Sequence, residues 1–247
     1  MAERALAIDD SLGEAYAILG YVYFRDFDFE KIEKTLERSI ELNPNHAFAR
    51  IWRSGLYIYY GRFDEAIEDS RRILELNPLG AFEHTHHLWI LYQARRFDEA
   101  VAFGRKAIAA DPHFIHGIGA FSWVLRHVGK TDEALEYARR VVEMTNRSPR
   151  SMNELASCYA KAGETEKARQ ILRKLDDSQS VKYVSPCSLA IAYLNLGDRE
   201  RALTELDNAF VMRDPLMLWI ASEPEADALR GDPRFIDLER RIKNAAK

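Results

Sequence analysis

The sequence of 247 residues contains only two cysteines, Cys158 and Cys187, which lie far apart in the chain. Two distant cysteines do not form a disulfide framework, and they lack the close spacing of metal knuckles and redox pairs. No run of apolar residues approaches the roughly 20 that a helix needs to cross a membrane. The first residues also lack the apolar stretch of a signal peptide. These absences favour a cytoplasmic protein in a reducing compartment.

An excess of basic residues is also missing, because the 35 lysines and arginines are outnumbered by 39 acidic residues. Nucleic-acid-binding proteins usually carry a clustered basic face, so the charge argues against a nucleic acid partner. The sequence has no nucleophile motif, no phosphate-binding glycine loop and no H-E-x-x-H zinc motif. We therefore expect neither an enzyme nor a protein that holds a cofactor.

Three histidines close together, His84, His86 and His87, raise the possibility of a metal site. A metal site needs three or four ligands that converge at set distances, and nothing else in the sequence supplies them. We interpret these histidines as contacts between repeats or as surface residues, and we predict no metal site.

What the sequence does contain is a period of 34 residues. One column of this period holds a small side chain in five of six places: Ile32, Ala66, Ala100, Ala134, Ala168 and Ala202. A second column, twelve residues earlier, is also mostly small: Gly20, Ser54, Leu88, Ser122, Ala156 and Ala190. A third column contains four glycines: Phe27, Gly61, Arg95, Gly129, Gly163 and Gly197.

These columns predict pairs of antiparallel helices. Small side chains allow two helix backbones to approach closely, and a larger side chain there would force them apart. Glycine in the third column can take the positive φ that ends the first helix of each pair. Acidic residues such as Asp64, Asp98 and Asp132 begin each second helix, where a carboxylate can cap free amides. We expect helix pairs at about 13–42, 47–76, 81–110, 115–145, 149–175 and 183–212.

The pattern resembles the tetratricopeptide repeat family, most specifically from Gly61 to Ala66 and from Glu75 to Pro78. The resemblance implies an all-α fold, a right-handed α-solenoid of six repeats over residues 13–214. Residues 2–10 match the second half of a repeat and form either a cap or the end of an excised fragment, and we favour the fragment. Residues 215–247 break the period and predict a helical cap that starts at Asp232-Pro233, so that 1–247 is one domain.

Four stretches resemble a narrower group, the C-terminal tetratricopeptide region of bacterial multidomain regulators. They are residues 25–29, 183–186, 196–202 and 229–235. In that group the repeats follow a winged-helix, adenylate cyclase or protein kinase domain. The resemblance implies a regulatory or oligomerisation domain related to such proteins.

The first helix of each pair would line the concave groove of the solenoid, and aromatic residues recur at the groove positions of the first four repeats. These aromatic residues predict a site for a peptide or helix, with polar contacts at one end. The alternative is that the aromatic residues form the core or pack against the solenoid's own neighbouring turn. The candidate groove residues are Tyr21, Phe24, Phe48, Phe82, Trp89, Tyr92, Trp123, Arg126, His127, Asn153 and Lys161.

Two functions fit this pattern. The first is a non-catalytic scaffold that binds a protein or peptide partner in the aromatic groove. The second is a regulatory domain that clamps an effector domain or associates with itself. We expect no membrane contact in either case.

Overall fold

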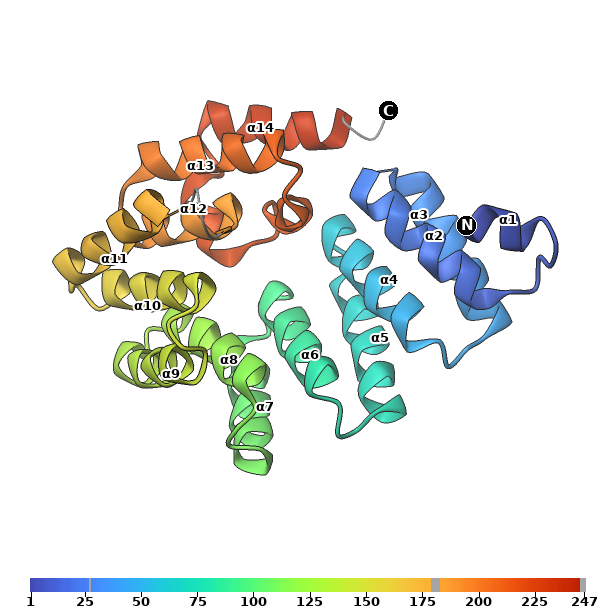
Figure 1. Cartoon of the computed structure of the whole chain (residues 1–247), viewed down its shortest axis with the longest axis horizontal. Coiled ribbons are helices and arrows are strands. Elements are labelled where there is room, and N and C mark those ends of the chain that lie inside the picture. Colours follow the sequence, from blue (N-terminus) through green and yellow to red (C-terminus); the bar gives the residue numbers. More distant parts are fainter. Residues whose placement is uncertain (27, 179–182, 245–247) are drawn as a thin grey trace.

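The expected all-α solenoid is confirmed by a computed structural model, which describes residues 1–26, 28–178 and 183–244. In these ranges the chain forms helices and connecting turns, without a β-strand. Figure 1 shows the helix pairs following one another along an arc whose two ends face each other. No helix in the described ranges combines the length and the apolarity that crossing a membrane requires.

Six helix pairs occupy the positions that the period predicts, within a few residues. The pairs are α2 (Gly13–Asp26) with α3 (Phe29–Leu42), α4 (Ala47–Tyr60) with α5 (Phe63–Leu76), α6 (Ala81–Gln93) with α7 (Phe97–Ala110), α8 (Ile115–His127) with α9 (Thr131–Met144), α10 (Pro149–Lys161) with α11 (Thr165–Ser178), and α12 (Pro186–Asn195) with α13 (Arg199–Val211). They are preceded by the short helix α1 (Ala2–Leu6) and followed by two 3₁₀ helices, η1 (Pro215–Trp219) and η2 (Pro224–Leu229), and by α14 (Pro233–Asn244).

The small-residue columns lie where the helices of a pair touch. All six residues of the column from Ile32 to Ala202 are 0% exposed. At Gly20 in the second column, an added Cβ would lie 2.5 Å from Cδ2 of Leu36, closer than side chains can approach. At Gly20 a larger side chain would therefore clash with the other helix of its pair, as the sequence predicts, whereas the first and third pairs also bury a large residue of these columns, Ile32 and Leu88.

The turns between paired helices depend on a left-handed residue. Gly61, Gly129, Gly163 and Gly197 have φ between 72° and 79°. The same position in the third repeat is Arg95, which has a φ of 60° although a side chain disfavours this region. Phe27, in the same column, lies outside the described residues. Because a non-glycine residue at positive φ is strained, Arg95 needs a compensating interaction.

One local expectation is wrong. Asp64, Asp98 and Asp132 lie inside the first turn of their helices, and the N-cap residues are instead Arg62, Arg96 and Lys130, without a side-chain cap. The N-cap position falls two residues earlier than the aspartate, so the aspartate does not occupy the position from which a side chain caps the helix. What remains for these aspartates is the favourable charge interaction with the helix dipole.

Beyond the sixth pair, the chain turns back into the solenoid. Residues 215–230, which we call the inner segment, include η1 and η2, and they place Met217, Leu218 and Ile220 in the core at 0–1% exposure. Leu218 packs with Phe24 and Leu56 of the first two repeats, whereas Met217 and Ile220 pack with α13 and α14. The predicted capping helix is α14, whose Phe235, Leu238 and Ile242 are buried.

The positive φ at the turns predicts a simple stability difference. Replacing Gly129 by alanine should lower the free energy of unfolding by about 1–2 kcal/mol, because alanine disfavours the left-handed region. The added methyl group itself meets nothing within 4 Å, so only the backbone conformation is tested. Urea unfolding of Gly129→Ala gives this value.

Gly231→Ala is the matched control, since Gly231 has open space around it and no positive φ. We expect its free energy of unfolding to stay within about 0.5 kcal/mol of that of the unsubstituted protein. Equal losses in both variants would contradict the left-handed explanation.

Candidate functional site

Trp219 of the inner segment fills the middle of the concave face. Its indole Nε1 donates a hydrogen bond of 2.8 Å to the main-chain oxygen of Gly55 on α4. Its ring lies 5.0 Å from the ring of Trp89, edge to face, and 5.5 Å from that of Phe24. An added Cβ at Gly55 would lie 3.1 Å from Cζ2 of Trp219, so the glycine makes room for the indole.

Glu223 of the inner segment binds the end of α6. Its carboxylate accepts hydrogen bonds from the Tyr92 hydroxyl, at 2.7 Å, and from Nε2 of Gln93, at 2.9 Å. The Ser222 hydroxyl donates to Oε1 of Gln93 at 2.9 Å. The side-chain polar atoms of Tyr92 and Gln93 are thus bound by residues 222 and 223.

Glu225 forms a buried ion pair with Arg126 of α8. The guanidinium donates through Nε at 2.9 Å and through Nη2 at 2.7 Å, and the two side chains are 3% and 6% exposed. Arg126 also pairs with Glu154 of α10, and Asn195 of α12 donates to Glu225 at 3.2 Å. Removal of one member of such a pair leaves a buried charge uncompensated, which costs about 3–5 kcal/mol.

Asp227 forms the last of these contacts of the inner segment, at the rim of the concave face. Both of its oxygens accept from Arg95, each at 2.7 Å, and one also accepts from Nε of Arg230 at 2.6 Å. A bidentate pair between a guanidinium and a carboxylate is among the stronger hydrogen-bonded contacts in proteins. It offsets the strained backbone of Arg95.

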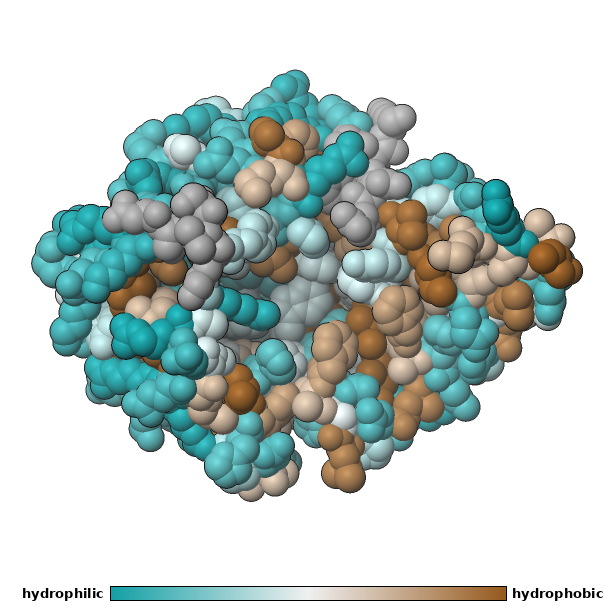
Figure 2. All heavy atoms as spheres, viewed as in Figure 1, coloured by the Kyte–Doolittle hydropathy of each residue, from teal (hydrophilic) through white to brown (hydrophobic). Residues whose placement is uncertain are grey.

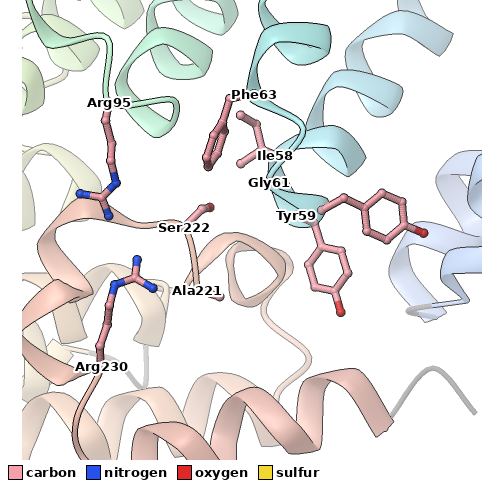
Figure 3. A pocket seen from close by; sticks show the side chains of 9 residues that line it. Ile58, Tyr59, Gly61, Phe63, Arg95, Ala221, Ser222 and Arg230 are labelled. Atoms are coloured by element: carbon pink, nitrogen blue, oxygen red, sulfur yellow. The ribbon is translucent and has the colours of Figure 1, made fainter.

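A cleft of about 430 Å³ lies beside this rim, between the α4–α5 turn and the inner segment. Figure 3 shows Tyr59 and Phe63 on one side of it, and Arg95 and Arg230 on the other. Because both arginines already bind Asp227, the cleft is the seam along which the inner segment meets the repeats.

The neighbouring carboxylates of the inner segment are held in different protonation states. Burial raises the pKa of Glu223 to about 7, and the charge of Glu225 adds to the rise. Burial would raise the pKa of Glu225 as well, but the charge and hydrogen bonds of Arg126 hold it below its usual value. Arg95 lowers the pKa of Asp227 in the same way. Glu223 is therefore the group in this row that titrates near neutral pH.

Four of the predicted groove residues contact the inner segment, namely Phe24, Trp89, Tyr92 and Arg126. Their side chains do point into the concave face, but the chain's own residues occupy that space. The sequence left open that the groove residues are core or pack against the solenoid's own neighbouring turn, but the segment that these four contact comes from beyond the sixth repeat.

Four others lie at one end of the face, where the charge of Glu225 acts on His127. The ring of His127 packs 4.5 Å from Phe97, and Arg150 lies 5.9 Å from the ring of Trp123. Nδ2 of Asn153 donates to the Ser188 oxygen at 3.0 Å, while Lys161 is exposed. The polar end of the predicted groove is thus partly used in contacts between repeats.

The remaining three, Tyr21, Phe48 and Phe82, are exposed on the first helices of three successive pairs. We call them the aromatic ledge. The rings of Tyr21 and Phe48 lie 6.2 Å apart, and both contact Trp52. Figure 2 shows apolar residues gathered on the side of this face formed by the first repeats, beside the hollow at its centre.

The three histidines take separate partners. Nε2 of His86 lies 2.8 Å from the Ser54 hydroxyl, Nδ1 of His87 lies 2.7 Å from that of Ser70, and Nδ1 of His84 lies 2.8 Å from the Gly80 oxygen. Burial lowers the pKa of His86 to about 3 and that of His87 to about 4, so both stay neutral. Among the described residues, no three potential metal ligands converge.

Sequence reasoning missed the inner segment, because the 34-residue period stops before it. Two signals pointed to it. Gly55 occupies a column in which neighbouring repeats carry Tyr21, Trp89 and Trp123, and Arg95 occupies a column of glycines. Both departures from the repeat face the inner segment in the structure.

Comparison with known families agrees with this geometry. Three family models, each described as a tetratricopeptide repeat, match residues 13–46, 56–113 and 125–180. The chain carries tetratricopeptide repeats. A search of the curated proteins found no match to the sequence.

Several solved tetratricopeptide structures have a similar fold. PilW, a type IV pilus biogenesis factor, is 20% identical with a TM-score of 0.59, over 88% of this chain and 97% of that one. PilF of Pseudomonas aeruginosa is 19% identical with a TM-score of 0.57, over 87% and 98%. A tetratricopeptide protein of Parabacteroides merdae is 12% identical with a TM-score of 0.57, over 95% and 97%. At such identities the likeness concerns the fold, and the resemblance to multidomain regulators stays a prediction.

The raised pKa of Glu223 predicts a pH dependence of stability. Between the usual value of 4.5 and about 7, the folded protein binds more protons at Glu223 than the unfolded chain does. The free energy of unfolding therefore falls as the pH rises through this window, by about 1 kcal/mol between pH 6 and pH 8. Glu223→Gln should remove this part of the pH dependence, as measured by urea unfolding at several pH values.

Glu37→Gln, at an exposed glutamate, is the control and should keep the full pH dependence. His127, whose pKa is lowered by burial, titrates in all three proteins and cancels in the comparison. If Glu223→Gln and the unsubstituted protein show the same slope against pH, Glu223 is not the group that titrates.

Proposed function

We propose that this chain is a non-catalytic protein-interaction scaffold that binds a peptide or helical segment on the aromatic ledge. The observation that supports the proposal is the exposure of the three ledge rings, 37% for Tyr21, 41% for Phe48 and 58% for Phe82. They stand on three successive first helices, and a soluble protein seldom exposes such a series of aromatic side chains without a use. Tetratricopeptide repeats are a scaffold for binding other proteins, and the ledge gives this scaffold an apolar face.

The ledge is suited to binding at low entropic cost. Its helices are held by the buried small-residue columns, and an aromatic side chain has few rotamers to lose. Full burial of one such ring contributes about 1.5–3 kcal/mol. Trp52, packed between Phe24 and the rings of Tyr21 and Phe48, supports the ledge from below.

Substitution of the ledge tests this function. The triple variant Tyr21→Ser, Phe48→Ser, Phe82→Ser should bind the partner at least tenfold more weakly, because each ring would be an anchor of the interface. The partner is first captured from a lysate of the source cells with the unsubstituted protein. It is then purified, and its affinity for both proteins is measured by calorimetry.

The matched control is Val211→Ser, Met212→Ser, which removes exposed apolar side chains at the other end of the solenoid. Circular dichroism verifies that all variants are folded. A partner that binds the ledge variant and the control equally tightly would falsify the ledge as the binding surface.

Self-association is a second candidate function, favoured by an apolar patch away from the ledge. Tyr183, Val211, Met212 and Leu216 are 63%, 76%, 57% and 42% exposed around the C-terminal end of α13. Ser185 and Asp214, which are hydrogen-bonded at 2.5 Å, hold the two ends of this patch together. A second copy of the chain could bury it, as the regulatory alternative requires.

Sedimentation velocity tests this candidate. We expect a dimer whose population falls when Val211 and Met212 are both replaced by lysine, because charges at the patch oppose its burial. The ledge variant, used as the control, should keep the dimer. A monomer at every concentration of the unsubstituted protein would rule out self-association through this patch.

A further inference from the structure

The inner segment is held by side-chain chemistry of the kind that binds a separate peptide. The ring of Trp219 fills the space beside Gly55. Three carboxylates follow it at the fourth, sixth and eighth positions, Glu223, Glu225 and Asp227. Each of the four has its own partner on the repeats. Trp219 binds α4, Glu223 binds α6 and Glu225 binds α8. Asp227 binds the turn between α6 and α7. The first three contacts fall on three successive repeats, the second to the fourth, and the contact of Asp227 returns to the third.

The repeats are specialised to make these contacts. The hole for Trp219 exists because Gly55 replaces the large residue of its column. The rim contact exists because Arg95 replaces a glycine and tolerates a φ of 60°. Two departures from the repeat pattern, each unfavourable for the helix or the turn that contains it, both serve the same row of contacts.

We propose that the concave groove is a recognition site for a segment that carries a tryptophan followed by carboxylates at the fourth, sixth and eighth positions. The inner segment is its resident ligand, and an acidic segment of a partner protein with the same spacing replaces it. This site is separate from the aromatic ledge, and the proposal goes beyond the function assigned to the ledge.

The charges of the groove select an acidic ligand. Arg126 lies deep in the groove and Arg95 at its rim, and each forms two hydrogen bonds with its carboxylate. A basic segment would leave both arginines without carboxylate partners and would place like charges beside them. A smaller side chain in place of tryptophan would leave the Gly55 oxygen without its donor and the space beside Trp89 empty.

Covalent linkage gives the resident ligand an advantage. A tethered segment binds at an effective concentration in the millimolar range, so a free peptide of the same sequence competes poorly with it. Weakening the resident contacts without changing the groove should therefore increase the affinity for an added peptide.

The experiment uses the full chain and a fluorescein-labelled peptide of residues 215–230, with binding followed by fluorescence anisotropy. The opened variant Trp219→Ala, Glu225→Ala keeps Gly55, Arg95 and Arg126 unchanged. We expect it to bind the peptide at least tenfold more tightly than the unsubstituted protein does. A peptide with Glu223→Gln, Glu225→Gln and Asp227→Asn should lose this gain, and so should an opened variant that also carries Gly55→Leu.

Asp227→Asn keeps the proposal testable if the opened variant fails to fold, because it weakens only the half-exposed ion pairs of Asp227 with Arg95 and Arg230. It should raise the affinity for the peptide above that of the unsubstituted protein, by a smaller factor. The ledge variant in the opened background should bind the peptide as tightly as the opened variant does, which separates this site from the ledge. A folded opened variant that binds no peptide, or that binds the neutral peptide equally well, would overturn the proposal and leave the ledge function untouched.

Discussion

The buried guanidinium of Arg126 is the interaction on which the closed form of this solenoid depends. It binds Glu154 of the next repeat and Glu225 of the inner segment, so one side chain connects α8, α10 and η2. A guanidinium that is 3% exposed is stable only when its charge is balanced by hydrogen-bonded carboxylates. This requirement holds η2 against α8 and α10, and the buried side chains of Met217, Leu218 and Ile220 hold the preceding residues of the inner segment.

Most of the fold could be predicted because it is local. Each helix pair is determined by residues within one 34-residue unit, such as Ala66 and Ala134 at the close contacts and Gly61 and Gly129 at the turns. The same columns recur six times, so an error in one repeat is corrected by the others. The N-cap positions were predicted less well, because a shift of two residues moves Asp64 from the cap into the helix.

The site could be predicted only in part. The groove positions of the repeat identified Trp89, Tyr92 and Arg126 as side chains that point inward, which the structure shows. What occupies the groove could not be predicted, because the partners of these residues lie about a hundred or more positions away along the chain. No period links such residues. The sequence signals of the contact are two residues that depart from their repeat columns, Gly55 and Arg95. Whether the ledge and the groove bind a partner stays a prediction.

The hydrogen bond from Trp219 to Gly55 joins residues 164 positions apart, and it changes how the repeats should unfold. In an open array of repeats, each unit interacts only with its neighbours, and the ends can fray while the middle stays folded. Here the second, third and fourth repeats are fastened to the far end of the chain, so the loss of one end removes contacts from the middle. Such a closed array should lose its structure in one cooperative step. It should also fold slowly for a helical protein, because its last contacts close the longest loops.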